Sequence, residues 1–320
     1  MKIKTTQILL FWLVICCATL TTSCSTQEHK KSENMQKEMA SSPTLASLNQ
    51  FAVINGKKIA YRDIGKGQPI ILCNRFRGIM DSWDPAFIDA LSKQYRVLLF
   101  DYSGIGLSSG VLDTTILGIA NDVKDLADFL KLEKFAILGW SFGGIVSQTF
   151  SVHYPEKISH TIIIGARPPG ENAHPIEPLF LQTAFHEIND LKDEEILFFE
   201  PASAASREAA KLSHERIAAR KTELDIPVTK QTWALYFKAA EDFSTDRNQT
   251  REKLARLSTP ILILSGDHDI SGPIENWYAL TRKMPNMYIN VLPASGHGPQ
   301  HQYPELSAQY IGTFLSYTQR

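Results

Sequence analysis

Short apolar runs alternate with stretches of helical periodicity along most of the chain, and this alternation constrains the fold more than any other feature. Each run has the length of a buried strand, and the stretches between them carry apolar residues three or four positions apart. The runs occupy residues 69–73, 97–100, 135–138, 161–164, 260–264 and 288–292. Strands that alternate with helices predict an α/β fold with a mostly parallel central sheet, right-handed crossovers and helices on both faces.

One long segment interrupts the alternation. Between residues 167 and 253, helical stretches follow one another with no buried strand, among them an Ala-rich one over 203–220 and another over 231–243. We therefore expect a core formed by residues 51–166 and 254–320 and an inserted helical cap formed by residues 167–253. Apolar side chains of the cap either line a pocket or pack the cap onto the core, and for any single residue packing is favoured.

The N-terminus has the features of an export signal. Two lysines precede an apolar stretch over residues 8–18, which is far shorter than the roughly 20 residues that span a bilayer. Small residues then lead to Cys24, and a polar segment without aromatic residues follows it. We interpret residues 1–23 as a signal peptide and residues 24–50 as a flexible tether.

The end of this signal resembles that of a bacterial lipoprotein, although Thr21 stands where such signals usually have Leu. The resemblance implies that Cys24 is diacylated and becomes the new N-terminus. An exported protein that is anchored in a membrane and faces the periplasm or the cell surface would result. The alternative is a secreted soluble protein cleaved near Ser23. Cys73 is the only other cysteine after the predicted signal peptide. It lies in an apolar run, so we expect a buried free thiol.

The charge balance and the motifs exclude several classes of function. The chain has 33 basic and 34 acidic residues and no Lys/Arg-rich block, so we expect no nucleic-acid binding. The glycines of residues 103–110 do not form the G-x-G-x-x-G pattern of a dinucleotide site. His297 and His301 have the spacing of metal ligands on a helix, but Gly298-Pro299 interrupts such a helix. We therefore expect no cofactor and no metal, and the sequence does not indicate an oligomeric state.

Three loops hold the residues that could perform chemistry. The first reads Gly139-Trp140-Ser141-Phe142-Gly143 and lies between a predicted strand and a predicted helix. This is G-x-S-x-G in the context where a serine occupies a sharp, strained strand-to-helix elbow. The N–H group of Phe142 would lie at the helix N-terminus, where it can donate to an oxyanion. The pattern indicates that Ser141 is a nucleophile.

A carboxylate and an imidazole follow the last two predicted strands. Asp267 and Asp269 come just after the run that ends at residue 264, and His297 comes after the run that ends at residue 292. A serine hydroxyl becomes a good nucleophile when a positioned imidazole accepts its proton, and a carboxylate that binds Nδ1 fixes the imidazole tautomer. Either aspartate could serve as that carboxylate.

The order of Ser141, an acid after one late strand and His297 after the next resembles the α/β-hydrolase fold family. The loop at residues 101–108 is similar to the D-x-x-G-x-G-x-S segment of that family, and the resemblance extends over residues 51–317. It implies that Asp269, the last position of G-x-x-D, is the acid, with Asp267 as the alternative. By position it also implies that the N–H groups of Phe76 and Phe142 form the oxyanion hole.

One segment departs from the family pattern. Many members carry His-Gly after the strand that ends at residue 73, whereas this chain has Asn74-Arg75. Arg75 would place a cation near the mouth of the site, where it could bind an anionic group of the substrate. The alternative is a solvated arginine, or one paired with Asp81. Trp140, beside the nucleophile, is the other candidate for substrate binding.

The resemblance implies a serine hydrolase that cleaves a small-molecule carboxylic ester, or a related acyl compound, through an acyl-enzyme on Ser141. Within the same fold, C–C bond hydrolysis and perhydrolase or haloperoxidase-like chemistry are the alternatives. Relatives that act on haloalkanes or epoxides use Asp where this chain has Ser141. A non-catalytic ligand-binding module is a further alternative, because a fold alone does not fix a function.

Overall fold

The structure, a computed structural model, describes residues 36–318. The predicted signal peptide, Cys24 and the first part of the predicted tether lie outside the described residues. The chain divides into two units, residues 1–42 and 43–320. Among the described residues, no helix combines the length and the apolar character needed to cross a bilayer.

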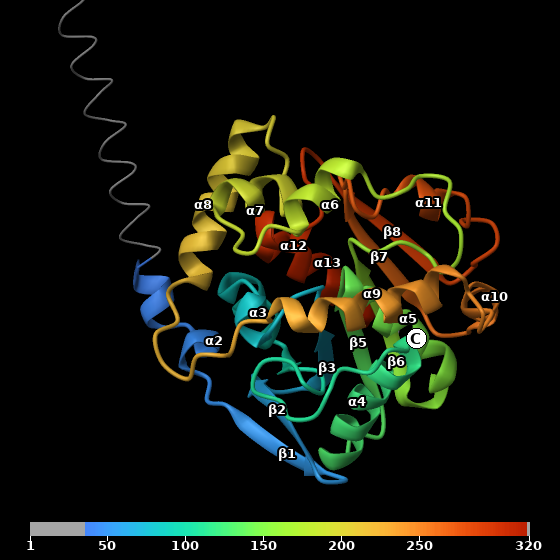
Figure 1. The fold of residues 1–320 in the computed structure, drawn as a ribbon, viewed down its shortest axis with the longest axis horizontal. Coiled ribbons are helices and arrows are strands. Elements are labelled where there is room, and N and C mark those ends of the chain that lie inside the picture. The colour runs from blue at the N-terminus through green and yellow to red at the C-terminus, as the bar shows by residue number, and fades with distance from the viewer. Residues whose placement is uncertain (1–35, 319–320) are drawn as a thin grey trace, which may run out of the picture. The chain divides into compact units, whose positions relative to one another are not determined.

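The centre of the larger unit is an eight-stranded sheet with the order β1-β2-β4-β3-β5-β6-β7-β8 (Figure 1). The strands are β1 Gln50–Ile54, β2 Lys57–Ile64, β3 Gln68–Cys73, β4 Tyr95–Phe100, β5 Phe135–Trp140, β6 Ile158–Ile164, β7 Ile261–Gly266 and β8 Met287–Leu292. β2 pairs antiparallel with β1 and with β4, and all other neighbours pair parallel. The prediction of a mostly parallel sheet is confirmed.

Burial explains why the central strands read as continuous apolar runs. All six residues of β5 are buried, as are the last four of β3 and of β4. Successive side chains of a strand point to opposite faces, so Ile70 and Leu72 join the apolar cluster on one face, while Ile71 joins the cluster on the other. Both faces therefore need helices to cover them.

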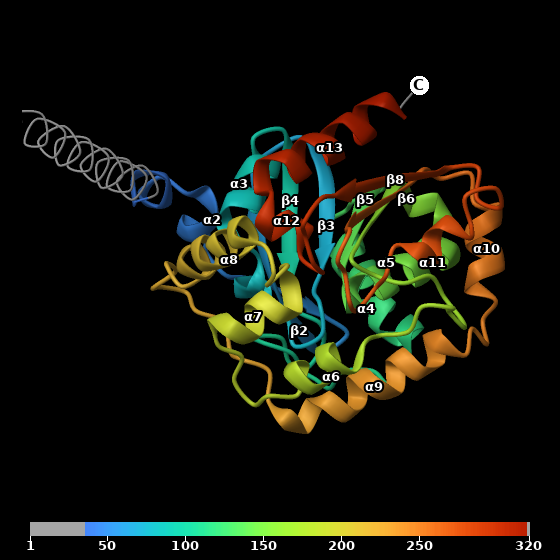
Figure 2. The ribbon, with the colours of Figure 1, turned by 90° about the horizontal axis from the view of Figure 1, so that it is seen from above.

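Four long helices of the core provide this cover (Figure 2). α3 (Pro85–Ser92) and α13 (Pro304–Tyr317) pack against each other on one face, and α4 (Ile116–Phe129) and α5 (Phe142–His153) do so on the other. The remaining helices of the core are short: α2 Pro43–Ala46, α10 Thr250–Arg256, α11 Glu275–Tyr278 and α12 Pro299–Gln302. The arrangement matches the predicted α/β class.

The segment between β6 and β7 is helical, as expected of a cap. It contains α6 Pro178–Ala184, α7 Leu191–Phe198, α8 Ala204–Ile217 and α9 Lys230–Ser244. α8 and α9 lie close to the two stretches that the sequence predicted. α10 follows at residues 250–256 and packs against α5, so the cap gives way to the core a few residues before the predicted boundary.

The end of the predicted tether is part of the folded unit. Thr44 is 4% exposed, and its backbone N–H donates to Oδ1 of Asp89 over 2.9 Å. Arg220 of the cap segment donates from Nη1 to the carbonyl of Thr44 over 2.8 Å. The prediction of a flexible tether through residue 50 is therefore wrong for residues 43–50. Polar composition suggested flexibility there, but the partners that fix this segment lie 45 and 176 positions away along the chain.

Candidate active site

Ser141 occupies the tight turn between β5 and α5. Its backbone has φ 57° and ψ −118°, a conformation that a non-glycine residue adopts only at a cost. A hydrogen bond of 2.8 Å from its N–H to the carbonyl of Ile164 holds it in place. A Cβ atom at Gly139 would lie 2.0 Å from the carbonyl oxygen of Gly143, and one at Gly143 would lie 1.9 Å from that of Cys73. Both glycines of the motif are thus required by close backbone contact.

A chain of hydrogen bonds joins Ser141, His297 and Asp269. Nε2 of His297 lies 2.7 Å from Oγ of Ser141, and Nδ1 lies 2.9 Å from each carboxylate oxygen of Asp269. Because a carboxylate only accepts hydrogen bonds, Nδ1 carries the proton and Nε2 is left to accept from the serine hydroxyl. His297 is 2% exposed and Asp269 is 5% exposed. The three residues predicted from the sequence therefore meet in the geometry of a nucleophile, a base and an orienting acid.

The structure distinguishes the two candidate acids. Asp269 accepts backbone hydrogen bonds of 2.8 Å from Ser271 and Gly272, which fix its carboxylate against His297. The side chain of Asp267 is 37% exposed and bonds to His268 over 2.7 Å. Asp267 also accepts from the N–H of Ser295, so it shapes the loop that carries His297 without touching the imidazole.

Gly165 is a site residue that the sequence analysis missed. It follows β6 and has φ +55°. A Cβ atom there would lie 2.5 Å from the carbonyl oxygen of His297 and 3.0 Å from its Nδ1. The sequence shows only a glycine after a buried strand, which is too common to mark a site. The absence of a side chain at Gly165 makes room for the base and its acid.

Phe76 and Phe142 carry the two N–H groups assigned to an oxyanion. Phe142 is the first residue of α5, where backbone N–H groups have no partner within the helix. In the described part of the chain, no hydrogen-bond acceptor is paired with the N–H of Phe76. Both residues line the cavity that contains Ser141. The two N–H groups are therefore available, as an oxyanion hole requires.

The cavity at Ser141 has a volume of about 210 Å³ and a largely apolar lining shared by core and cap. Its larger apolar residues are Phe76, Phe142, Ile145, Ile176, Phe180, Leu181, Phe185, Tyr236 and Phe237. The ring of Phe180 packs edge-on against the imidazole of His297, with the ring centroids 5.1 Å apart. Cap side chains thus both pack against the core and line the pocket. Polar groups at its wall include Arg167 and Ser271.

Arg77 ties the cap to the loop that carries Phe76. Its Nη1 donates to the carbonyls of Ala184 and His186 over 2.9 and 2.8 Å, and its Nη2 donates to that of Glu187 over 2.7 Å. The guanidinium carbon lies 4.4 Å from the ring centre of Trp233. One arginine therefore fixes the segment between α6 and α7 beside the candidate oxyanion hole.

Neither Arg75 nor Trp140, the two residues predicted to bind substrate, lines the cavity at Ser141. The indole of Trp140 is 1% exposed and donates to the carbonyl of His297 over 2.8 Å, so it supports the base. Arg75 donates from Nη1 to the carbonyl of Phe76, and Asp81 pairs with Arg62 in its place. Trp140 is the last residue of a strand, and alternation along that strand turns its side chain away from the nucleophile's cavity.

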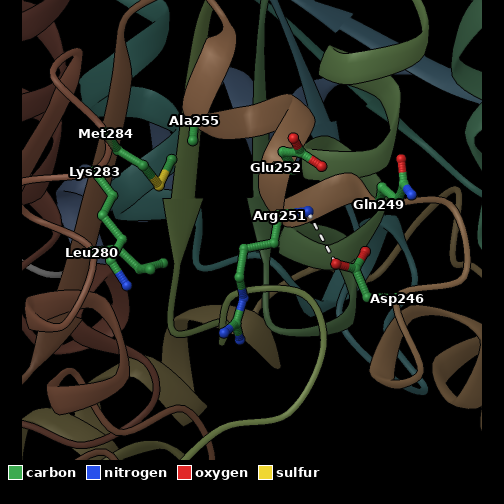
Figure 3. A pocket seen from close by; sticks show the side chains of 8 residues that line it. All are labelled: Asp246, Gln249, Arg251, Glu252, Ala255, Leu280, Lys283 and Met284. Atoms are coloured by element: carbon green, nitrogen blue, oxygen red, sulfur yellow. Dashed lines mark hydrogen bonds between the residues drawn. The ribbon is translucent and has the colours of Figure 1, made fainter.

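A larger cavity of about 380 Å³ lies between α10 and residues 280–284 (Figure 3). It contains no member of the Ser141, His297 and Asp269 group. Arg251 at its wall is already engaged, because its side chain donates to the carbonyls of Pro169 and Glu171. We therefore assign the candidate active site to the smaller cavity at Ser141.

Comparison with known proteins agrees with this geometry. A family model described as alpha/beta hydrolase fold matches residues 68–304. A protein of Caulobacter sp. (strain K31), provisionally named a carbamate hydrolase, is 26% identical over 260 residues, which are 78% of this chain and 91% of that protein. A 2-hydroxy-6-oxononadienedioate/2-hydroxy-6-oxononatrienedioate hydrolase of Paraburkholderia phymatum is 24% identical over 270 residues, 81% of this chain and 91% of that protein. The solved structure of an alpha/beta hydrolase fold protein from Chitinophaga pinensis superimposes with a TM-score of 0.78 at 27% identity, covering 85% of this chain and 98% of that one.

Proposed function

The chain belongs to the alpha/beta hydrolase fold family, and on that premise we propose that it is a serine hydrolase that cleaves a carboxylic ester through an acyl-enzyme on Ser141. The observation that carries the proposal is the continuous hydrogen-bonded path from Asp269 through His297 to Ser141. Relatives of this chain are named as hydrolases of several kinds and do not favour one substrate. We therefore propose an ester from the chemistry of the site alone.

The proposed reaction has two halves, acylation of Ser141 and hydrolysis of the acyl-enzyme, and the same groups of the site act in both. Oγ of Ser141 attacks the carbonyl carbon while Nε2 of His297 takes its proton, and the negative charge on oxygen is held by the N–H groups of Phe76 and Phe142. The imidazolium then protonates the leaving alcohol, and Asp269 stabilises the charge on the ring. His297 then deprotonates a water molecule that attacks the acyl-enzyme, and the resulting imidazolium returns the proton to Oγ of Ser141 as the acid leaves.

The shape and lining of the cavity support a small apolar acyl group. A volume of about 210 Å³ with a largely apolar wall favours a short hydrocarbon chain or a single ring over a long lipid tail. We expect the ratio kcat/KM to rise with acyl length over the first few carbons and then to fall when the cavity is full.

A second candidate is hydrolysis of a C–C bond in a substrate that bears a carboxylate. Arg167 lines the cavity, and burial lowers the pKa of its guanidinium, so a carboxylate would find a poorly solvated cation there. The relative from Paraburkholderia phymatum is named as a hydrolase of substrates that bear two carboxylates. Replacement of Arg167 by Gln would impair a C–C hydrolase far more than an esterase with uncharged substrates.

Substitution of the two aspartates tests the proposal. We expect Asp269→Asn to lower kcat for a short-chain p-nitrophenyl ester by about 10³- to 10⁴-fold, because the imidazole loses its orienting carboxylate. Asp267→Asn is the matched control, since Asp267 lies in the same loop and does not contact His297. Equal losses in the two variants, or full activity of Asp269→Asn, would contradict the assigned roles.

A further inference from the structure

A second cavity, of about 240 Å³, lies between the loop at residues 75–82 and the cap helices α7 and α8. It is distinct from the cavity at Ser141, because the two share none of their lining residues. Arg75, Trp140 and His301 line it from the core, and Glu194, Phe198 and Ser213 line it from the cap. Nothing in the proposed ester hydrolysis uses this cavity.

Arg75 is a cation without an ionic partner in this cavity. Among the described residues, no carboxylate lies within salt-bridge distance of its guanidinium. Asp81 pairs with Arg62 at 2.5 Å and with Arg220 at 3.3 Å, and Glu194 accepts from His214 over 2.9 Å. Nε of Arg75 is buried and has no hydrogen-bond partner in the described part of the chain. A half-buried cation with a buried, unused donor nitrogen is costly unless a ligand pairs with it.

Ser213 provides a second, independent indication of a ligand. It is 1% exposed and lines the same cavity from α8, and its Oγ has no hydrogen-bond partner among residues 36–318. Native proteins pair most buried polar groups, so an unpaired hydroxyl and an unpaired guanidinium nitrogen on two residues that line one cavity point to an absent polar group. A hydroxyl and a guanidinium can both donate, which indicates that this group is an acceptor.

The surrounding side chains narrow the chemistry of the acceptor. The guanidinium carbon of Arg75 lies 4.7 Å from the ring centre of Phe198 and 5.3 Å from that of Trp140, so the cation has aromatic rings beside it. Asp81 and Glu194 at the wall disfavour a dianion such as phosphate. Burial lowers the pKa of His301 to about 4, so its imidazole adds no charge at neutral pH. Asp81 is already paired with Arg62 and Arg220, so Arg75 is the cation left for an anion, and the aromatic walls favour one with a small apolar part.

We propose that this second cavity binds a small monocarboxylate, held by the guanidinium of Arg75 and the hydroxyl of Ser213. The planar fork of a guanidinium matches a carboxylate in geometry, and the rings of Trp140 and Phe198 receive the hydrocarbon part. The ligand site also adjoins the active-site loop, because Nη1 of Arg75 holds the carbonyl of Phe76 over 2.8 Å. The proposal concerns binding alone and does not depend on the proposed esterase activity.

Calorimetric titration of the purified protein with sodium acetate and sodium propionate, in a chloride buffer, tests the proposal. We expect saturable binding at one site per chain, with inorganic phosphate bound at least about tenfold more weakly. Arg75→Gln should weaken acetate binding by at least about tenfold, because a charge-assisted pair is lost. Ser213→Ala should weaken it by a smaller factor. Thr149→Val is the matched control, since Thr149 has a buried, unpaired hydroxyl elsewhere, on α5.

Filling each cavity in turn locates the carboxylate. Ser213→Leu, which fills the second cavity, should abolish binding, whereas Ala240→Leu, which fills the cavity at Ser141, should leave it unchanged. This pair of variants decides the question even if Arg75→Gln does not fold. Absence of saturable binding by the folded wild-type protein would overturn the proposal. Binding that survives Ser213→Leu or that is lost in Ala240→Leu would overturn it as well.

Discussion

Gly165 is the residue at which the smallest change should most disturb the base. Its φ of +55° and the 2.5 Å from an added Cβ to the carbonyl oxygen of His297 leave no room for a methyl group. We expect Gly165→Ala to lower kcat by about 10²-fold, because a displacement of roughly 1 Å of the imidazole is enough for such a loss. Steady-state ester hydrolysis by the folded variant would measure the effect.

Gly56→Ala separates the contact with His297 from the cost of the backbone conformation. Gly56 also has a positive φ, +80°, but an added Cβ there meets nothing within 4 Å. Both substitutions should lower thermal stability, and Gly165→Ala alone should lower kcat. Similar kcat values for the two variants would show that Gly165 does not position His297.

Arg75 and Trp140 show that a sequence motif does not predict the direction or the partners of a long side chain. Their position beside Phe76 and Ser141 in the chain suggested substrate contact, but the two side chains line a different cavity. Position in a motif predicts where a backbone atom lies, and it does so well for Ser141, Asp269 and His297. The direction and partners of a long side chain depend on residues far away in the sequence, such as Phe198 for Arg75.

A pair of buried carboxyl groups joins two elements, the loop after β4 and the loop between α8 and α9. A Cβ atom at Gly106 would lie 2.4 Å from Oδ2 of Asp101 and 2.5 Å from Oδ1 of Asp225, so both carboxyls border this glycine. The N–H of Met80 donates to both side chains, over 3.0 and 3.1 Å. Two carboxyls this close favour a state in which one of them is protonated, because a proton removes the repulsion between two negative charges.

Stability should therefore fall with rising pH through this pair. Burial raises the pKa of Asp101 well above its usual value, with Asp225 as the second cause, and burial also raises the pKa of Asp225. Asp81 faces Asp225 and raises its pKa further, whereas Arg62 lowers it. The folded chain thus holds a proton that the unfolded chain loses near pH 4. The contribution to stability is fully present below that pH and is lost as the pH rises through the pKa of the folded pair.

Thermal melting of Asp225→Asn between about pH 5 and pH 8 measures this contribution. The variant should show a smaller decline of the melting temperature with pH than the wild type, because an amide can donate to Asp101 without a shared proton. Glu241→Gln, an exposed change on α9, should leave the decline as it is. A wild-type and an Asp225→Asn profile that run parallel would refute the role of the pair.

The elements themselves were predictable where one local pattern determined them. β3, β4 and β5 are buried on both faces, so their apolar runs identified them, and α8 and α9 lie within a few residues of the predicted stretches. Residues 43–50 were not predictable in this way. Hydrogen bonds to Asp89 and Arg220 order this polar segment, and no short window of sequence contains them.

At the scale of the whole molecule, we propose that Cys24 carries acyl chains that anchor the folded unit in a membrane. Each buried CH₂ group contributes about 0.8 kcal/mol, so several chains on one residue suffice for stable attachment. We expect the full chain to sediment with membranes and Cys24→Ser to be soluble, with Cys17→Ser as the control. Mass analysis of the N-terminal peptide would identify the lipid. A Cys24→Ser protein that still sediments with membranes would contradict the proposal.

The most direct test of the central claim, that Ser141 is an activated nucleophile, is reaction with a fluorophosphonate probe followed by intact mass and peptide mapping. The hydrogen bond of 2.7 Å between Oγ of Ser141 and Nε2 of His297 predicts one adduct per chain, located on Ser141. The folded His297→Ala protein should not react. An unlabelled but folded wild-type protein, or an adduct on another residue, would contradict the claim.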